Sequence, residues 1–453
     1  MTLDRRRLLT SLAAGTLAAG FAPAFGAKRR DSASSPAAVS APLRNARGEV
    51  DWDAVRALYP LAPGWTHLAS FLFVSTPKPV AESIAYFRDK LDSDPVWMEL
   101  AAFTDSEGRP FVKAKTALAQ YLGGAPDEIA FTSNTTTALA MAYHGLRIRP
   151  DQEILTTTHD HFVHHESIRY SIERSGASTR RIALFDRPAA ASAQEIVDRI
   201  ARAIGPKTRA LGVTWAQSST GVLLPIPAIA AAVERANRGR ADADRCLLIV
   251  DGVHGFGNQD VDAARLGADF FAAGMHKWLA GPRGTGFLWG RRDAWPHLRP
   301  TIPNFDPDGQ AAWGAWMEGT PLPPTTAAFV SPGGFIAYEN LLAVPAAIEL
   351  QRAIGRDRIA ARIAELNGTF RREAAKLPNL TVHTPLEPAL SGGITCFEVR
   401  GLGAEDVVQR FASQKIRTTS SPYKVSYPRV SAGIMNRPED LDTALAALRR
   451  MSS

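Results

Sequence analysis

The sequence predicts an α/β fold with a mostly parallel sheet, and three observations support this prediction. Between about residues 125 and 290, short apolar segments alternate with stretches of helical spacing, which is the order that parallel sheets require. Most of these segments are continuously apolar, as in strands of a sheet that is covered on both faces. After about residue 320 the pattern changes to long helices and then to further strands, so we expect a smaller α+β domain there.

Six segments of the first region are strand candidates. They are EIAFT (128–132), EILTTT (153–158), TRALGVTWA (208–216), CLLIVD (246–251), DFFAAG (269–274) and GTGFLWG (284–290). Helical patterns such as TTALAMAYHGL (136–146) and QEIVDRIARAI (194–204) fill intervals between them. In the second region, long helices around 334–377 precede the strand-like segments LTVHTP (380–385) and GITCFEV (393–399).

The first 26 residues are predicted to be an export signal. A charged start precedes an apolar stretch from Leu8 to Phe25, and Ala22-Pro23-Ala24 offers a small-x-small cleavage site. The pair Arg5-Arg6 ahead of leucines resembles a twin-arginine signal, which implies a periplasmic or otherwise exported protein. A general secretory signal is the alternative. We expect a tether and N-terminal segment over 27–60, a large domain over 61–320 and a small domain over 321–453.

Composition excludes several classes of partner. The net charge is +7, from 52 Lys and Arg against 45 Asp and Glu, and no long basic run with interleaved aromatic residues suggests nucleic-acid binding. Outside the signal, no segment has the ~20 continuous apolar residues of a membrane span. The two cysteines, Cys246 and Cys396, lie in apolar segments, which indicates buried thiols rather than a disulfide framework.

Three motifs in chain order suggest a pyridoxal-phosphate site. A Thr-rich loop opens the helix after the first strand, at residues 134–137, and a helix N-terminus with hydroxyl donors can hold a phosphate. Asp251 ends a buried strand, where ligands of open α/β sheets bind. Lys277 follows, with His276 and Arg283 expected to supply the cationic surroundings that favour an unprotonated amine. Pyridoxal phosphate needs these three: a lysine for the covalent imine, an acid for its pyridine nitrogen and a phosphate cradle.

Each motif also has a simpler explanation. One of the threonines could be an ordinary N-cap, and Asp251 could cap the helix that follows. The segment THDHFVHHE (158–166) adds a further alternative, because His159, His161 and His164 approach the His-x-His-x-x-His pattern of binuclear zinc hydrolases. That pattern needs an Asp before its last His, and Val163 stands there. One histidine could instead be an aromatic platform beside a flat ligand.

With these motifs, the sequence resembles the class V aminotransferases, which are fold-type I pyridoxal-phosphate enzymes. The resemblance covers roughly residues 60–450 and rests on SNTTTAL, DGVH, GADFFAAGMHKWLAGPRGTGFL, EGTP and RVSAGIMN in combination. Members of the isopenicillin-N epimerase type look nearer than the cysteine desulfurases. The resemblance implies a large domain with a mostly parallel seven-stranded sheet, a smaller C-terminal domain and a homodimer with shared active sites.

The resemblance also implies a role for each matching residue. Lys277 would bond covalently to the cofactor and move the proton of the substrate's α-carbon. Asp251 would hold the pyridine nitrogen, while His254 and Ser218 would approach the ring hydroxyl. His161 would stack on the ring, and the phosphate would be bound by Thr135, Thr136 and His276. Thr320 would reach the phosphate of the neighbouring subunit, and Arg429 would bind the substrate's carboxylate as a planar bidentate donor.

Two departures from the family pattern bear on the reaction. The segment TTSSPYKVSYPRV (418–430) lacks the cysteine that desulfurases use, so sulfur transfer by a persulfide is not expected. In LASFLFVSTP (68–77), Ala69 and Val74 stand where Asn and Gly are usual, which suggests an altered substrate pocket. Transamination of an amino acid is the favoured reaction, with epimerisation at the α-carbon and C–S lysis as alternatives. A periplasmic binding protein without turnover is a more distant alternative.

Overall fold

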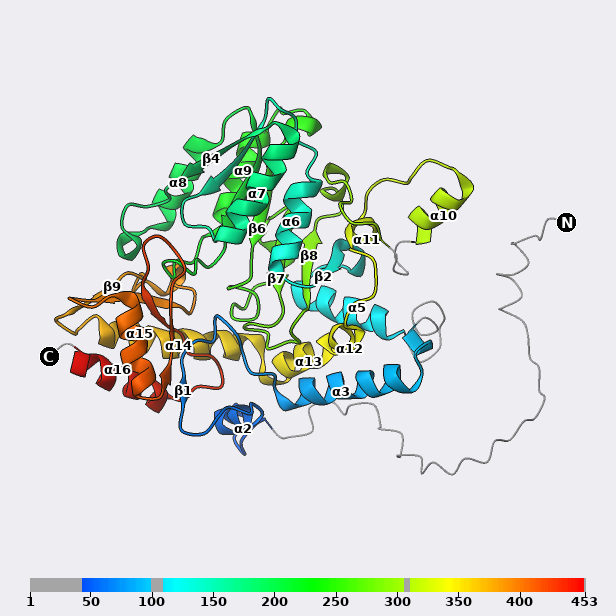
Figure 1. The fold of residues 1–453 in the computed structure, drawn as a ribbon. Helices are drawn as coiled ribbons and strands as arrows, with labels where there is room; N and C mark the ends of the chain where they lie inside the picture. Colours follow the sequence, from blue (N-terminus) through cyan, green and yellow to red (C-terminus); the bar gives the residue numbers. More distant parts are fainter. Residues whose placement is uncertain (1–42, 99–108, 305–309, 452–453) are drawn as a thin grey trace, which may run out of the picture. The chain divides into compact units, whose positions relative to one another are not determined.

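A computed structural model describes residues 43–98, 109–304 and 310–451, and its centre is a seven-stranded sheet (Figure 1). The strand order is β2-β8-β7-β6-β5-β3-β4, and only β8 runs antiparallel to its neighbours. The predicted α/β fold with a mostly parallel sheet is therefore confirmed. The bounds are β2 (Ile129–Thr132), β3 (Glu153–Thr157), β4 (Ser178–Ile182), β5 (Thr208–Thr214), β6 (Leu247–Asp251), β7 (Phe270–Gly274) and β8 (Gly286–Gly290).

All six predicted strands of this region are present, but β4 was not predicted. Its sequence, STRRI, is mostly polar, and each of its residues is exposed or half-buried. It lies at the edge of the sheet and pairs only with β3. An edge strand does not need the continuous apolar run of a central one. A search for apolar runs therefore did not detect β4.

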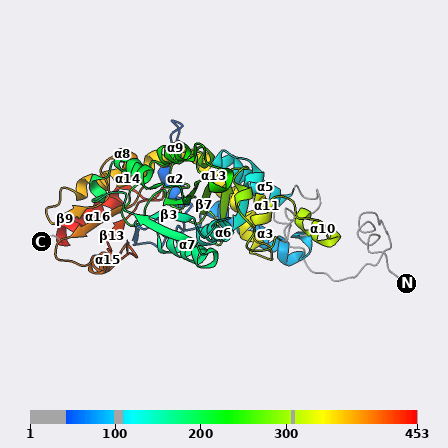
Figure 2. The ribbon, with the colours of Figure 1, turned by 90° about the horizontal axis from the view of Figure 1, so that it is seen from above.

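Helices cover both faces of the sheet because successive strand residues point to opposite sides. In β6, Leu247 and Ile249 share a core with α6 (Thr135–Gly145) and α7 (Phe162–Ser175). Leu248 and Val250 share a second core with helices of the other face. That face carries α5 (Pro110–Leu122), α8 (Ala193–Ala203) and α9 (Ile226–Asn237). Figures 1 and 2 show α6 and α7 side by side, in agreement with their contacts.

The C-terminal part contains the predicted second group of strands. The order β12-β13-β10-β9 forms an antiparallel sheet, which shares a core with the helices beside it. Its strands and helices are β9 (Leu380–Val382), β10 (Thr395–Val399), β12 (Thr419–Ser420), β13 (Pro428–Val430), α14 (Arg356–Ala374), α15 (Ala404–Ser413) and α16 (Pro438–Met451).

The segment before the large sheet pairs with this C-terminal part. β1 (Thr66–His67) runs parallel to β11 (Ile416–Arg417). Helices α12 and α13 follow residue 320, yet they pack into the core of the large sheet. The domain limits given above stay predictions. The remaining helices are α2 (Trp52–Ala57), α3 (Lys78–Ser93), α10 (Gln310–Glu318), α11 (Ala327–Val330), α12 (Tyr338–Leu342) and α13 (Val344–Ile354). Within the described ranges, no helix is long and apolar enough to cross a bilayer.

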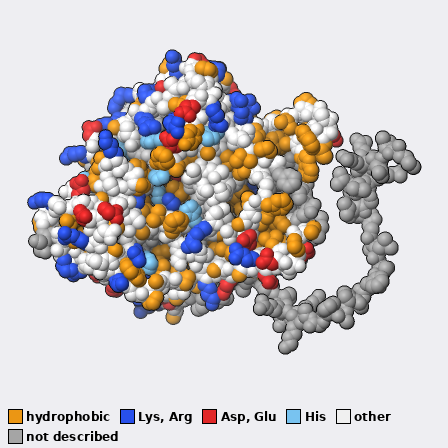
Figure 3. Space-filling view, viewed as in Figure 1, with side chains coloured by type: hydrophobic (Ala, Val, Ile, Leu, Met, Phe, Trp, Pro, Cys, Tyr) orange, Lys and Arg blue, Asp and Glu red, His pale blue; other side chains and the backbone are white. Residues whose placement is uncertain are grey.

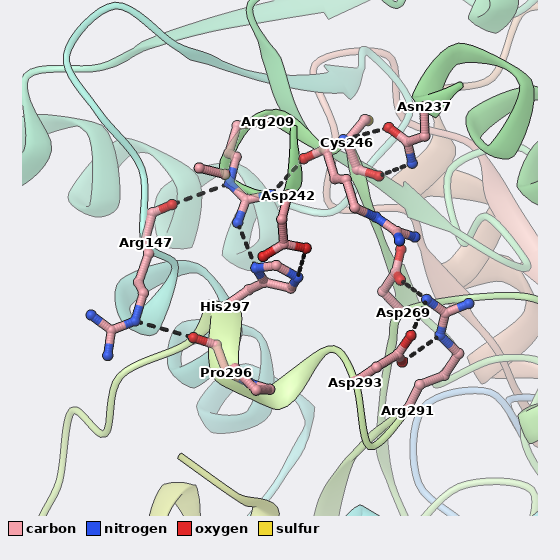
Figure 4. Close-up of polar contacts among 12 residues, drawn as sticks. Arg147, Arg209, Asn237, Asp242, Cys246, Asp269, Arg291, Asp293, Pro296 and His297 are labelled. Atoms are coloured by element: carbon pink, nitrogen blue, oxygen red, sulfur yellow. Dashed lines mark hydrogen bonds and ion pairs between the residues drawn. The ribbon is translucent and has the colours of Figure 1, made fainter. Parts of the chain in front are cut away.

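A buried arginine organises the amino-terminal edge of the sheet (Figure 4). Arg209, in β5, donates to the carbonyls of Arg147 and Arg245, and its Nη2 lies 3.1 Å from Nδ1 of His297. On its other side, Nε2 of His297 lies 3.5 Å from Asp242. His297 therefore accepts a hydrogen bond from a cation, and burial, reinforced by Arg209, lowers its pKa.

We expect acid to destabilise the protein well before its carboxylates are neutralised. Burial lowers the pKa of eight of the ten histidines. Such a histidine binds fewer protons in the native state than in the unfolded state. The free energy of unfolding therefore falls as the pH drops below about 6.5, the pKa of histidine in the unfolded chain. The thermal midpoint of the cofactor-free protein should fall between pH 7 and pH 5. His297→Gln should weaken this dependence, and a midpoint constant over that range would contradict the prediction.

Candidate active site

One cavity gathers nine of the ten predicted site residues. Its volume is about 190 Å³, and it lies where β3, β5, β6 and β7 end, which is where ligands of open α/β sheets bind. The predicted residues that line it are Thr135, Thr136, His161, Ser218, Asp251, His254, His276, Lys277 and Arg429. Thr320 lies elsewhere: it is exposed just after α10, and its N–H donates to the carbonyl of Ala315.

Lys277 is held in a tight turn after β7. The N–H of Ala280 donates to the Lys277 carbonyl at 2.9 Å, and Ala280 has φ 56°, a left-handed conformation that residues other than glycine seldom adopt. Burial lowers the pKa of the Lys277 amine to about 8, with Arg429 acting in the same direction and Asp251 opposing it. Relative to an ordinary lysine at 10.4, the unprotonated fraction at neutral pH rises by roughly 200-fold. The site thus increases the share of the nucleophilic, unprotonated form of the amine.

His276 and Arg283 were the expected cationic neighbours of Lys277, but His276 is not a cation and Arg283 acts on the pKa of His276. Burial lowers the pKa of His276 to about 4, so this histidine is neutral at pH 7 and does not act as a cation. Arg429 supplies positive charge instead, although it lies 152 residues away along the chain. His276 packs beside Phe73, with ring centroids 5.8 Å apart.

Asp251 ends β6, and His254 follows it. The carboxylate of Asp251 accepts a hydrogen bond from the Val253 N–H at 3.1 Å, and burial raises its pKa to about 6. A buried carboxylate of this kind is stabilised by a cationic ring nitrogen. His254 Nε2 lies 3.4 Å from the Lys277 Nζ, so the residues at the end of β6 lie next to the lysine.

The Thr-rich loop forms the start of α6, as the phosphate cradle requires. Asn134 is the N-cap, because its side chain accepts from the Thr137 N–H at 2.9 Å. The alternative that one threonine merely caps the helix is therefore wrong. A Cβ at Gly286 would lie 2.8 Å from the Asn134 backbone, so a glycine is required for β8 to approach this loop. Thr135 and Thr136 are left to face the cavity.

The opposite wall comes from the ends of β3 and β5. His161 caps α7, and its Nδ1 accepts from the Val163 N–H at 3.3 Å. Ser218 follows β5, and its carbonyl accepts a hydrogen bond from Arg429 Nη1 at 3.1 Å. The ring of His161 is thus fixed in orientation, as a stacking platform must be.

Arg429, in β13, is buried and pre-positioned. Its Nη2 donates to Thr419 Oγ1 and to the Ser420 carbonyl, at 2.9 and 2.8 Å. The guanidinium also lies 4.3 Å from the ring centre of Phe71, a cation–π distance. Among the described residues no acid is paired with it by an ion pair, and its buried Nε has no hydrogen-bond partner there. An anionic substrate group would satisfy this cation.

The three histidines of the zinc alternative do not converge. His159 stacks on Phe185, with centroids 4.2 Å apart, and accepts from the Leu184 N–H. His164 is buried against the hydroxyl of Tyr143, whereas His161 faces the cavity. No group of three His, Cys, Asp or Glu side chains suited to a metal ion occurs in the part of the chain that the structure describes. The zinc alternative has no structural support.

Several residues of the cavity were missed from the sequence. Phe71 and Leu72 come from LASFLFVSTP, the segment that differs from the family pattern. Pro422 comes from the loop before β13. The unusual residues of the first segment were a signal that this wall differs, but they did not show which side chains face the cavity. The other cavity residues that sequence reasoning missed are Val163, Thr214 and Val253, whereas Asn134 belongs to the predicted phosphate loop, 134–137.

The donor set fits pyridoxal phosphate. Four buried polar atoms of cavity residues have no hydrogen-bond partner among the described residues: Thr135 Oγ1, Thr214 Oγ1, His254 Nδ1 and Arg429 Nε. Buried polar atoms are normally satisfied, so these four are placed for a polar ligand. Hydroxyl groups at a helix start, a buried acid and a lysine of lowered pKa match the phosphate, the pyridine nitrogen and the aldehyde of this cofactor.

The fold and the cavity define a pyridoxal-phosphate enzyme of fold type I, and the family match agrees. The chain belongs to the class V aminotransferase family (Aminotransferase class-V), which it matches over residues 75–443. Pyridoxal 5′-phosphate is therefore its cofactor, and the chain is an enzyme of this family.

Two groups of relatives share this family. The chain is 29% identical to isopenicillin N epimerase of Streptomyces clavuligerus over 413 residues, covering 88% of this chain and 98% of that protein. It is also 29% identical to a probable cysteine desulfurase of Aeropyrum pernix over 256 residues, covering 55% and 58%. Among solved structures, a C-DES variant with glycine covalently linked to its PLP cofactor has a TM-score of 0.75 at 22% identity, covering 87% of this chain and 98% of that one.

Proposed function

We propose that this protein is an epimerase that inverts the α-carbon of an amino acid or of a compound with a free amino-acid group. The observation that carries the proposal is one cavity that holds an amine of lowered pKa, Lys277, and a buried cation, Arg429, that has no ion-pair partner among the described residues. The near full-length similarity to an isopenicillin N epimerase supports inversion as the reaction branch.

Each polar residue of the cavity would have its own role in such a reaction. When bound, the cofactor bonds to an amine and withdraws electrons from the adjacent α-carbon, which makes the α-proton removable. Arg429 would hold the carboxylate, Asp251 would keep the pyridine nitrogen protonated, and Lys277 Nζ would accept the α-proton. Thr135, Thr136 and His276 would hold the phosphate, while His161 and His254 with Ser218 would fix the ring.

Other outcomes of α-proton removal share this machinery. Transamination stays a prediction, because the relatives named above are epimerases and desulfurases. C–S lysis through an enzyme persulfide is disfavoured, since Cys246 and Cys396 are both buried and are the only cysteines of the chain. A binding protein without turnover would not need an amine of lowered pKa.

One experiment separates these functions. The purified, cofactor-loaded protein is incubated in D₂O with isopenicillin N and, separately, with each of the common chiral L-amino acids. Epimerisation gives the inverted compound with deuterium at the α-carbon. Keto acid with aminated cofactor would indicate transamination, and ammonia with keto acid or sulfide would indicate lysis. Absence of deuterium from every compound, despite bound cofactor, would favour a binding protein.

A homodimer is part of the proposal. Hydrophobic side chains gather over α10 and the segment after it (Figure 3), where Trp316 is 74% exposed and Leu322 68% exposed. Apolar patches of this kind mark interaction surfaces. Thr320 lies in the same segment, so a second copy bound there could bring Thr320 towards its neighbour's phosphate site.

Export is proposed from the N-terminal sequence, which lies outside the described residues. Replacing Arg5 and Arg6 together by Lys should leave the precursor in the cytoplasm, because twin-arginine export requires that pair. Fractionation of cells expressing the full chain measures this. Periplasmic accumulation equal to that of the unmodified chain would indicate the general secretory route.

A further inference from the structure

A tyrosine outside the predicted set lies in the C-terminal part and contacts two residues of the cavity. Tyr423 lies in the loop between β12 and β13, directly after the cavity residue Pro422. Its hydroxyl is 2.8 Å from Ser218 Oγ, and its ring stands edge-on to His161, with centroids 5.9 Å apart and planes at 86°. Both partners line the cavity.

The loop that carries Tyr423 is held by its own hydrogen bonds. The N–H of Ser421 donates to the Tyr427 carbonyl, and the N–H of Tyr427 donates to Ser421 Oγ. Ser426 Oγ also donates to the Ser421 carbonyl, at 2.6 Å. The position of the phenol is therefore built into the loop rather than dependent on the Ser218 contact.

Tyr423 and Lys277 contact cavity residues that follow different strands. Across the sheet the strands run in the order β7, β6, β5, β3. Lys277 follows β7 and lies against His254, which follows β6. Tyr423 contacts Ser218, which follows β5, and His161, which follows β3. The contacts of the amine and those of the phenol therefore lie at the two ends of this row of strands.

Arg429, the proposed binding site of the substrate's carboxylate, is connected to the Tyr423 phenol through Ser218. Its Nη1 donates to the carbonyl of Ser218, whose side chain pairs with Tyr423. A substrate whose carboxylate binds Arg429 therefore has its α-carbon close to the wall that carries Tyr423. Burial raises the pKa of Tyr423 well above its usual value, so the phenol keeps its proton at neutral pH.

We propose that Tyr423 is the second acid–base residue of the enzyme and acts on the face of the α-carbon opposite to Lys277. This inference rests on the proposed epimerase function, because inversion requires that a proton leave one face and return to the other. In one direction, Lys277 Nζ takes the α-proton and the C–H electron pair stays on carbon. The Tyr423 O–H bond then breaks and its proton goes to the opposite face of carbon. The resulting ammonium and phenolate are reset by proton exchange with solvent, so atoms and charge balance.

The test is Tyr423→Phe, with Tyr427→Phe as the matched control in the same loop. Tyr427 stacks on His383, with ring centroids 4.1 Å apart, and His383, unlike the partners of Tyr423, is not a residue of the cavity. Each variant is loaded with pyridoxal phosphate and incubated in D₂O with the two enantiomers, separately, of the amino acid that the wild type inverts fastest. Absorption titration of the cofactor-free proteins and thermal melting serve as readouts that do not depend on turnover.

Tyr423→Phe should lose inversion by about 100-fold or more, the usual contribution of a general acid or base. One enantiomer should still exchange its α-proton through Lys277 and retain its configuration, whereas the other should lose exchange. Affinity for pyridoxal phosphate should be unchanged, and Tyr427→Phe should match the wild type.

Three results would overturn the proposal in distinguishable ways. Inversion by Tyr423→Phe at the wild-type rate would remove Tyr423 from the reaction and leave the epimerase function standing. Loss of exchange from both enantiomers with the cofactor bound would show that the phenol positions the ligand and gives no proton to one face. A wild type that exchanges the α-proton of every compound without inverting any would refute the epimerase function itself.

Discussion

Replacing Lys277 by Ala is expected to abolish covalent attachment of the cofactor and to reduce turnover by at least about 1,000-fold. Two roles are lost together, since Lys277 is both the amine that bonds to the cofactor and the proposed base, and a base alone contributes about 10²- to 10⁴-fold. The unmodified protein should absorb in the visible and lose that band on borohydride reduction, with the label on the peptide that contains Lys277. The variant should carry no label on that peptide, because any cofactor that it retains is not bonded to the protein.

The pH dependence of attachment gives a second check on the same residue. Only the unprotonated amine reacts, so the rate at which cofactor-free protein takes up pyridoxal phosphate should rise with pH and level off above about 8, the pKa to which burial lowers Lys277. Lys78→Ala is the control, because Lys78 is largely exposed on α3. A rate still rising steeply above pH 9 would show that the amine is not desolvated.

Most of the cavity could be predicted because its residues follow strands that the sequence shows clearly. Asp251 ends β6, an uninterrupted apolar run, and Lys277 comes shortly after β7, another such run. Parallel strands bring their carboxyl ends to one edge of a sheet, so residues at these ends meet whatever their separation in the chain. Chain order and strand ends were sufficient to place the acid, the lysine and the phosphate loop together.

The cavity wall beside Arg429 could not be predicted, because its residues do not follow strands that the sequence shows clearly. Phe71 and Tyr423 come from irregular segments at opposite ends of the described chain; Phe71 lines the cavity beside Arg429, and Tyr423 contacts the cavity residue Ser218. Their approach depends on pairings of two- and three-residue strands, such as β1 with β11. Such short pairings have no periodicity to detect.

The charge states of the site residues could not be predicted from the sequence either. His276, next to Lys277, suggests a cationic neighbour, but burial keeps this histidine neutral. Burial is a property of the folded chain, and it decides whether a histidine near pH 7 carries charge. Arg429 supplies the charge from the second sheet, so the pKa of the lysine depends on the docking of the C-terminal part against the large sheet.

Arg429→Ala should weaken substrate binding by roughly 30- to several-thousand-fold, which corresponds to about 2–5 kcal/mol for losing one partner of a buried charge pair. The visible band of the bound cofactor should persist, because Lys277 and the phosphate loop are untouched. The decarboxylated amine of the same substrate should bind the variant and the wild type similarly. Arg429→Lys should restore only part of the affinity, since an ammonium cannot donate two parallel hydrogen bonds to a carboxylate.

A structural role of Arg429 has to be separated from this binding role, because the guanidinium also holds Ser218, Thr419 and Ser420. Loosening of that loop would lower the thermal midpoint and would weaken the carboxylate-free amine as well, whereas loss of a carboxylate contact would spare the amine. Arg417→Ala is the matched control: Arg417 stacks on Trp65 at 3.6 Å and does not line the cavity, so its loss should leave affinity unchanged. If Arg417→Ala weakened the amino acid and Arg429→Ala did not, the carboxylate would bind outside the cavity described above, and the assignment of Arg429 would be wrong.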